Sequence, residues 1–373
     1  MGTAVAELLE YLTPEERHEL DAHLLALKHN APHTIYQQDP VGWMRDVLGI
    51  PEHTIRWSLN AGYEKHRWDG TPDPLVKMLE SLADWKDVGV ESGTGTGKSF
   101  TAAAGAVLWF LACWQGSRVF TFAPKEDQLR LFIWSEIAKV WAKFQAHFPD
   151  AELSDLRIRM DGTDNWGAWG YAVGVRADEE VATKAAGMHA EHMLIVYEEM
   201  PGIPKPVIAA GENTCTAPHN LRLGLGNPDN QLDALHEHCT APGVVHVIAS
   251  ALDHPNVVTG DASIVPGAVS TVSIERRKAQ YGEASPLYNS RVRGISPTEA
   301  TDSLIRLEWL ERAVKNYESW KDNPKIAFGP PAKGVDVANS ENGDEAAIAD
   351  YGGPILESVR SFPCPDANVL GYI

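Results

Sequence analysis

A glycine-rich run that ends in lysine and serine is the first place in this sequence where residue types and spacing could do chemistry. The run ESGTGTGKS, at residues 91–99, follows a short apolar stretch and precedes an alanine-rich one. Glycines let successive backbone N–H groups turn towards an anion, and a following helix adds the positive end of its dipole. Lys98 would reach the β- and γ-phosphates of ATP, and the Ser99 hydroxyl would bind Mg²⁺. The other residues expected to bind ATP in this loop are Gly93, Thr94, Gly95, Thr96 and Gly97.

The first position of this phosphate loop departs from the usual pattern. G-x-x-x-x-G-K-[ST] begins with glycine, whereas Ser92 stands here. A small residue is tolerable at that position, so we expect the loop to keep its shape. The alternative is a glycine-rich turn with a chance lysine and serine, but the strand expected before it and the helix expected after it favour a phosphate loop.

Two carboxylates follow an apolar run at residues 193–197, and they supply what a phosphate loop lacks for hydrolysis. Glu198 would hold the Mg²⁺ shell, and Glu199 would orient or deprotonate the attacking water. Neighbouring side chains of a strand point to opposite sides, which suits two separate roles. Tyr197 and the glutamate at position 198, where aspartate is commoner, depart from the usual pattern. The alternative is a solvated acidic loop after a core strand.

The pattern of apolar runs predicts how these groups are positioned. From about residue 87, short apolar runs alternate with longer helical ones, which indicates a sheet built from βα units. Strands are expected at residues 88–90, 118–122, 172–175, 193–197, 221–225 and 244–248. Helices are expected at residues 98–114 and 126–148. The second should bury one face, made of Leu129, Phe132, Ile133, Ile137, Val140 and Trp141.

Four segments are expected along the chain. They are an N-terminal helical segment at residues 1–30, a P-loop ATPase domain at 31–322, a linker at 323–333, and a three-stranded antiparallel meander at 334–373 that opens a second domain.

Composition narrows the class of protein. Lys and Arg number 32 against 51 Asp and Glu, a net charge of −19, which argues against a protein that coats DNA nonspecifically. No uncharged apolar run reaches the ~18 residues of a membrane span, and the N-terminus lacks the basic start of a signal peptide. The four cysteines lack paired spacing, which suits a reducing cytoplasm. His236-Glu237-His238-Cys239 looks metal-binding, but without a second ligand pair in sequence a surface loop is the favoured interpretation.

Several motifs in a fixed order resemble those of the large terminase subunits of tailed phages, across roughly residues 50–350. They are VESGTGTGKSF, FTFAPKEDQLRLFIWSEI, AAGMHAEHMLIVYEEMPGIP, LGLGNP, the DHPNV segment at 253–260, RVRGISP and GVDVANSENGDEAAI. The resemblance implies an α/β fold: a strand-inserted P-loop ATPase of the ASCE type with a central, mostly parallel sheet, followed by the start of an RNase H-like nuclease. It implies an ATP-hydrolysing motor that translocates double-stranded DNA into a procapsid.

The resemblance also assigns roles to residues. It makes Lys98 and Glu199 catalytic, Ser99 and Glu198 the Mg²⁺ ligands, and Asn227 the residue that couples hydrolysis to movement, although a simple Asn-Pro turn would also explain Asn227. Arg176 is a candidate arginine finger acting on a neighbouring subunit. Two departures concern the nucleotide. Residues 93–96 lack a basic residue, and Trp68 lacks the glutamine of the adenine signature.

Asp336 and Asp344 match the opening acids of the terminase nuclease, with Asp336 expected in the middle of the first meander strand. Two-metal cleavage needs several carboxylates around two cations. Because the sequence ends at Ile373, before the family's later acids, we expect no nuclease activity. A second pair of divalent cations, Mg²⁺ or Mn²⁺, would bind only if the nuclease were completed.

The implied partners are double-stranded DNA, further copies of the chain in a ring, the portal protein and the small terminase subunit, with no membrane. The implied location is the cytoplasm of an infected bacterial host, not the mature virion. The alternative function is another DNA-directed P-loop ATPase, a helicase-like or repair translocase, which arginine-bearing motifs after Asn227 would favour. A nucleotide-binding assembly subunit without activity would be favoured by loss of Lys98 or both glutamates, yet all three are present.

Overall fold

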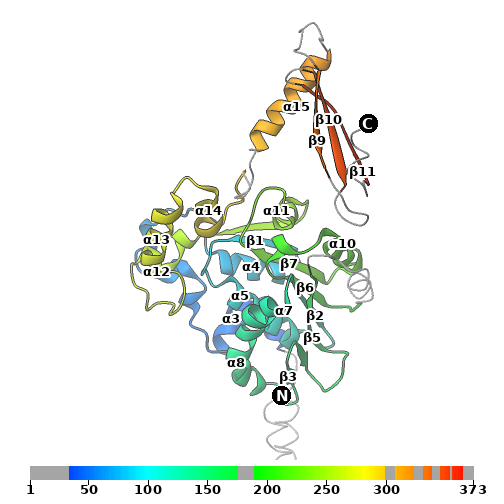
Figure 1. The fold of residues 1–373 in the computed structure, drawn as a ribbon. Helices are drawn as coiled ribbons and strands as arrows, with labels where there is room; N and C mark the ends of the chain where they lie inside the picture. Colours follow the sequence, from blue (N-terminus) through cyan, green and yellow to red (C-terminus); the bar gives the residue numbers. More distant parts are fainter. Residues whose placement is uncertain are drawn as a thin grey trace, which may run out of the picture. The chain divides into compact units, whose positions relative to one another are not determined.

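An eight-stranded sheet organises the first of two units in the computed structural model (Figure 1). The structure describes residues 33–174, 189–298, 307–322, 331–337, 345–352 and 355–363. The two units are Met1–Asp302 and Ser303–Ile373. The strands of the first are β1 (Val88–Ser92), β2 (Arg118–Ala123), β3 (Glu152–Ser154), β4 (Arg157–Arg159), β5 (Gly167–Ala172), β6 (Met193–Tyr197), β7 (Asn220–Gly226) and β8 (Val245–Ala249).

The order of these strands is β3-β4-β5-β2-β6-β7-β1-β8. From β5 to β8 all neighbours pair in parallel, whereas β3 and β4 add an antiparallel edge. Strand β1 pairs with β7 on one side and β8 on the other, so β7 lies between β1 and β6. This confirms the expected α/β fold with a mostly parallel sheet and one strand inserted between the two that carry the phosphate loop and the paired glutamates.

Both faces of the sheet are buried, as the continuous apolar runs of its strands require. In β6, Leu194 and Val196 face a cluster that also holds the helix residue Phe110, whereas Met193 and Ile195 face a second cluster. The helices are α3 (Pro40–Asp46), α4 (Pro74–Ala83), α5 (Lys98–Thr101), α6 (Trp109–Cys113), α7 (Glu126–Leu129), α8 (Ser135–Gln145), α10 (Lys205–Thr214), α11 (Ala234–Thr240), α12 (Pro255–Val258), α13 (Thr271–Tyr281) and α14 (Pro286–Tyr288). Helices α10 and α11 cover the second cluster, and α3 to α8 cover the first.

The two long helices expected from sequence are present, each interrupted by a π-helical segment. The first runs from Lys98 to Cys113 through Ala102–Leu108, and the second from Glu126 to Gln145 through Arg130–Trp134. A π turn adds one residue and rotates the residues around it. The expected buried face is therefore wrong at Phe132, whose side chain is exposed, while Ile133 is buried.

One expected strand was misplaced. The structure has β5 at Gly167–Ala172, whereas residues 172–175 were expected, and Val175 lies outside the described residues. Two glycines lower the strand propensity of this segment, so the sequence does not indicate a strand there. A side chain at Gly170 would lie 2.8 Å from Trp134 Nε1, and one at Gly167 would overlap the carbonyl of Ile158. Close packing against these neighbours therefore requires glycine at both positions, although glycine is uncommon in strands.

The second unit contains helix α15 (Leu307–Asp322) and the strands β9 (Pro331–Asp336), β10 (Ala346–Gly352) and β11 (Ile355–Phe362). The strands form an antiparallel sheet in the order β11-β10-β9, so the expected meander is confirmed. Asp336 is the last residue of β9 and not its middle, because the strand starts earlier, inside the expected linker. Pro331 can start it because β9 is an edge strand.

Other sequence predictions lie outside the described residues: the helical segment at 1–30, Arg176, Asp344 and residues 323–330 of the linker. The units divide after Asp302, earlier than the expected boundary after residue 322, and the domain assignment stays a prediction. Within the described part of the chain, none of the helices is long and apolar enough to cross a membrane.

Candidate nucleotide-binding site

The glycine-rich run forms a loop between β1 and α5, as expected. Gly95 and Gly97 have φ values of 83° and 88°, which side chains rarely adopt, and Gly97 precedes the first turn of α5. The Ser92 hydroxyl lies 2.8 Å from the Gly93 carbonyl and 2.6 Å from Thr96 Oγ1. Serine at the first position therefore braces the loop from inside, which explains how the departure from glycine is accommodated.

The two glutamates after β6 both approach this loop. The Ser99 hydroxyl donates to Glu198 Oε1 at 2.5 Å, and Lys98 Nζ lies 3.9 Å from Glu199 Oε1. The expectation that they point to opposite sides is wrong, because the strand ends at Tyr197 and Glu199 has a φ of 50°. This left-handed backbone, uncommon for a residue with a side chain, turns the second carboxylate back towards the loop.

Glu198 is fully buried, and its Oε2 has no hydrogen-bond partner among the described residues. Burial raises the pKa of Glu198 to about 7, while Lys98 and the Ser99 hydroxyl oppose that shift. A buried carboxylate oxygen without a partner, next to a serine hydroxyl, is an oxygen donor set that fits Mg²⁺. These two residues therefore fit the ion that the sequence assigned to them.

A cavity of about 570 Å³ opens beside the loop. Loop and helix residues from Gly95 to Thr101 form one wall. The remaining lining residues are Ile50, Pro51, Thr54, Ile55, Leu75, Phe132, Glu136, Lys139, His254, Val265, Pro266, Gly267 and Ala268. The cavity is lined both by the phosphate loop and by apolar side chains such as Ile50, Pro51 and Leu75, which suits a ligand with phosphates and a flat apolar ring.

Sequence reasoning missed the apolar wall of this cavity. Trp68 was the sequence candidate for the adenine contact. It does not line the cavity, and its ring stacks on that of Trp57 with the planes 10° apart. Ile50, Pro51 and Ile55 come from a segment of short turns without regular periodicity. Outside the phosphate loop, two of the motifs were available signals for parts of the cavity lining: DHPNV, which contains His254, and the motif at residues 120–137, which contains Phe132 and Glu136.

Asn227 follows β7 and is buried against the loop. Its Nδ2 donates to the Ser92 carbonyl, and its Oδ1 accepts from Arg291 Nη1 at 3.1 Å. The backbone carbonyl of Arg291 accepts from the Thr94 N–H at 2.9 Å. Asn227 therefore connects the loop to Arg291, a residue that the sequence singled out only as part of RVRGISP.

Arg291 belongs to a segment, Asn289–Arg293, that ends in Gly294. Gly294 has a φ of 66°, and a side chain there would lie 2.6 Å from the backbone nitrogen of Gly93. Ser296, two residues later, donates to Glu91 Oε1 at 2.6 Å. We call residues 289–296 the clasp, because they contact the start of the phosphate loop through the Arg291 carbonyl, the Gly294 backbone and the Ser296 hydroxyl.

The remaining candidates divide into described and undescribed residues. Asp336 is exposed at the end of β9, and Asp344 and Arg176 lie outside the described residues. The expected surface loop at 236–239 is wrong, because these residues form most of α11, in which His238 and Cys239 are buried against β1.

A phosphate loop after β1, two carboxylates directly after β6, and an asparagine directly after the strand inserted between them are the arrangement of the strand-inserted P-loop fold. A scan of family models found no match. The chain is 27% identical over 287 residues to the probable terminase large subunit of Enterobacteria phage P7, covering 74% of this chain and 54% of that protein. This match confirms the resemblance to large terminase subunits. The chain spans about half the length of the phage P7 protein.

Solved structures similar to the chain include the large terminase of a thermophilic bacteriophage, with 12% identity and a TM-score of 0.45 over 78% of this chain and 68% of that one. The large terminase ATPase domain of Thermus phage P74-26 has 16% identity and a TM-score of 0.45, covering 67% of this chain and 96% of that one.

Proposed function

We propose that the chain is the ATP-hydrolysing part of a viral terminase motor that translocates double-stranded DNA into a procapsid. One observation supports hydrolysis above all: the Ser99 hydroxyl donates to Glu198, and Lys98 Nζ lies 3.9 Å from Glu199, while Lys98 and Ser99 also line the cavity. The match to a probable terminase large subunit supports DNA packaging as the use of that activity.

In this proposal the loop from Gly93 to Ser99 binds the phosphates of ATP. Its backbone N–H groups and the start of α5 supply the positive end of dipoles, and Lys98 supplies a full charge. The adenine would lie along the apolar wall that includes Ile50, Pro51 and Ile55. Burying a flat ring against aliphatic side chains contributes affinity without requiring a hydrogen bond.

Ser99 and Glu198 would hold Mg²⁺. When bound, the ion neutralises charge on the β- and γ-phosphates during transfer. The unpartnered Oε2 of Glu198 supports this role, because the carboxylate is already held by one oxygen and has the other to offer.

Glu199 would orient and deprotonate the attacking water. Its carboxylate lies 3.9 Å from Lys98 Nζ, so a phosphate reached by the lysine would also face Glu199. The left-handed backbone at Glu199 is a strained conformation of the kind that concentrates at catalytic sites. This geometry supports assigning the base to Glu199 and the metal ligand to Glu198.

Asn227 would couple hydrolysis to movement. It contacts the loop at Ser92 and the clasp at Arg291, so a shift of the loop on phosphate release would reach both β7 and the clasp. These two contacts support a role in which Asn227 connects the phosphate loop to the clasp.

The function is tested by the ATPase rate of the full chain with and without linear duplex DNA. We expect hydrolysis that requires Mg²⁺ and accelerates when linear duplex is added. Stimulation by single strands alone, with strand displacement, would instead support the alternative of a helicase-like or repair translocase. No hydrolysis under any condition would contradict both.

Replacing Asn227 with alanine should leave ATP binding nearly unchanged and remove the stimulation by duplex DNA. The two lost hydrogen bonds should together cost about 1–3 kcal/mol of stability. The matched control is Asn220→Ala, which removes an asparagine at the other end of β7 that donates to the Ala190 carbonyl at 3.0 Å. Equal loss of stimulation in both variants would contradict a coupling role for Asn227.

The second unit would correspond to the start of an RNase H-like nuclease, with Asp336 and Asp344 as metal ligands. Among its described residues there is no group of three side chains able to share a metal ion. Asp350 is instead engaged by Lys333 at 3.3 Å and by the Ser358 hydroxyl at 2.7 Å.

We therefore expect no cleavage of plasmid DNA by this chain in Mg²⁺ or Mn²⁺. Two-metal cleavage needs several convergent carboxylates. Agarose gels would measure nicking, with Asp336→Ala as the control. Cleavage that disappears in Asp336→Ala would show that the described carboxylates are completed into a working nuclease.

We also propose that copies of the chain assemble into a ring on duplex DNA. The portal protein and the small terminase subunit would be its partners, and Arg176 would act as an arginine finger on the next subunit. The cytoplasm of an infected bacterial host is the proposed location. The resemblance to large terminase subunits supports these partners.

A further inference from the structure

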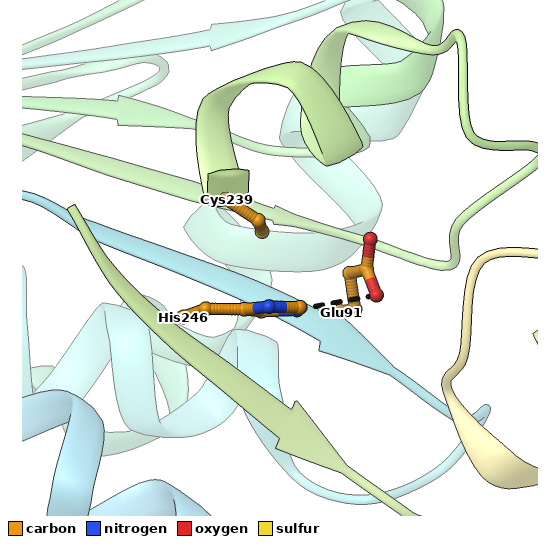
Figure 2. Close-up of side chains that lie close together, drawn as sticks. All are labelled: Glu91, Cys239 and His246. Atoms are coloured by element: carbon orange, nitrogen blue, oxygen red, sulfur yellow. Dashed lines mark ion pairs between the residues drawn. The ribbon is translucent and has the colours of Figure 1, made fainter. Parts of the chain in front are cut away.

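Three potential metal ligands converge beneath the phosphate loop, on the face of the sheet that α11 covers. Figure 2 shows Glu91 from β1, Cys239 from α11 and His246 from β8 directed towards one another. Their ligand atoms all lie within 4.8 Å of one another. Each comes from a different element, and none has been assigned to the ATPase reaction.

The register of the strands explains this convergence. Gly89 pairs with His246, and Glu91 lies two residues further along β1, so Glu91 and His246 project from the same face as diagonal neighbours. Helix α11 lies over that face. A side chain at Gly89 would lie 2.5 Å from Cys239 Sγ, so glycine at this position gives the sulfur its place against the strand.

Hydrogen bonds hold one oxygen of the Glu91 carboxylate, and the other oxygen faces His246. Oε1 contacts His236 Nδ1 at 2.7 Å and accepts from the Ser296 hydroxyl at 2.6 Å. Oε2 faces His246 Nε2 at 3.2 Å. Carboxylates that bind metals are typically oriented by such hydrogen bonds to the oxygen that does not ligate.

His246 Nε2 is buried, and the pair with Glu91 lacks hydrogen-bond geometry, so within the described ranges this nitrogen has no hydrogen-bond partner. Burial alone would raise the pKa of Glu91, but His246, Ser296 and His236 outweigh burial and hold that pKa below its usual value. Glu91 is therefore a carboxylate at neutral pH and can offer Oε2 as a ligand.

We propose that Glu91, Cys239 and His246 bind a zinc ion, with a water molecule at the fourth position. Zn²⁺ accepts thiolate, imidazole and carboxylate together in a tetrahedron. Bonds of about 2.0–2.3 Å require ligand atoms about 3.5 Å apart. The 3.2 Å between Glu91 Oε2 and His246 Nε2 already matches, and the sulfur, which lies within 4.8 Å of both atoms, has to move closer to them.

The second cluster of potential ligands, Glu191, His192 and His219, is a weaker candidate. It lacks a thiol and is more exposed. The His192 and His219 rings stack with planes 2° apart and centroids at 4.9 Å, so their interaction is already satisfied face to face. It serves as an internal control for adventitious zinc.

A zinc ion at Glu91 would fasten α11 and β8 to the strand that carries the phosphate loop. Glu91 directly precedes Ser92 and pairs with Gly226, the residue before Asn227. The ion would thus set the position of the loop and of the coupling residue without taking part in hydrolysis.

Binding is tested by loading the full chain with one equivalent of Zn²⁺ in excess Mg²⁺ and a phosphine reductant, then desalting and measuring zinc by atomic emission. We expect about one zinc per chain. Cys239→Ala and His246→Gln should each lower zinc affinity at least about tenfold. Cys215→Ala and His219→Ala, which change a thiol and an imidazole elsewhere, should keep wild-type zinc.

A second measurement is made on the wild-type chain, so its result does not depend on whether the Cys239 and His246 variants fold. Co²⁺ in place of Zn²⁺ should give the wild-type chain a thiolate-to-cobalt charge-transfer band in the near ultraviolet, and Cys215→Ala should retain it. Absence of that band from the wild type, or equal zinc in Cys239→Ala and the wild type, would overturn the proposal and leave a hydrogen-bonded cluster around Glu91.

Discussion

Glu199→Gln should lose most ATP turnover while binding Mg²⁺-ATP as tightly as the wild type. The amide keeps the shape of the side chain but cannot take a proton from water, and general bases contribute about 10²–10⁴-fold to rates. Because only the chemical step loses its partner, kcat should fall and nucleotide affinity should not. Single-turnover hydrolysis and equilibrium titration with a fluorescent ATP analogue measure the two quantities separately.

Two matched variants make the assignment specific. Glu136→Gln changes a carboxylate that lines the cavity and pairs with Lys139 at 2.7 Å, and this variant should keep near wild-type turnover. Glu198→Gln should weaken the dependence on Mg²⁺ as well as the rate. If Glu199→Gln hydrolyses ATP at the wild-type rate, Glu199 is not the base.

Lys98→Ala should lose both nucleotide binding and turnover. Lys98 is buried and lies beside two carboxylates, so its removal leaves the phosphates facing Glu198 and Glu199 without a neutralising charge. Charge-assisted hydrogen bonds contribute about 1.5–3 kcal/mol, so ATP affinity should fall about 10- to 100-fold. Isothermal titration with a nonhydrolysable analogue would measure it.

The cavity provides its own control for this variant. Lys139 also lines it, but its side chain is 62% exposed and pairs with Glu136. Lys139→Ala removes the same charge from the same cavity and should change affinity little, because exposed charges are screened by solvent. Comparable losses in the two variants would mean that Lys98 acts only through the overall field of the cavity.

Local patterns were enough to predict the central sheet and the phosphate loop. Strand β6 was predicted at its observed bounds, because a run of five apolar residues between polar ones is typical of a buried strand. The loop was predicted from glycines that supply backbone conformations closed to other residues. These features depend on neighbours within a few positions, which a single sequence displays.

The contacts that complete the site depend on distant residues and could not be predicted. The partner of Asn227 is Arg291, 64 residues later, and the partner of Glu91 is Ser296, 205 residues later. The run at residues 236–239 was interpreted as a surface loop because no second pair of ligands follows at suitable spacing, whereas β1 and β8 place Glu91 and His246 beside Cys239. The order and register of the strands determine which distant residues lie together, and a single sequence does not show that order or register.

The clasp has a consequence for how the protein matures on the ribosome. Thr94 is held by the Arg291 carbonyl and Glu91 by Ser296, so the loop cannot take its final form until those residues have been synthesised. At about 5–20 residues per second, the interval after the loop emerges is roughly 10–40 s. A nascent chain should therefore gain affinity for ATP abruptly and late, when residue 296 leaves the exit tunnel, although its glycine-rich run emerged long before.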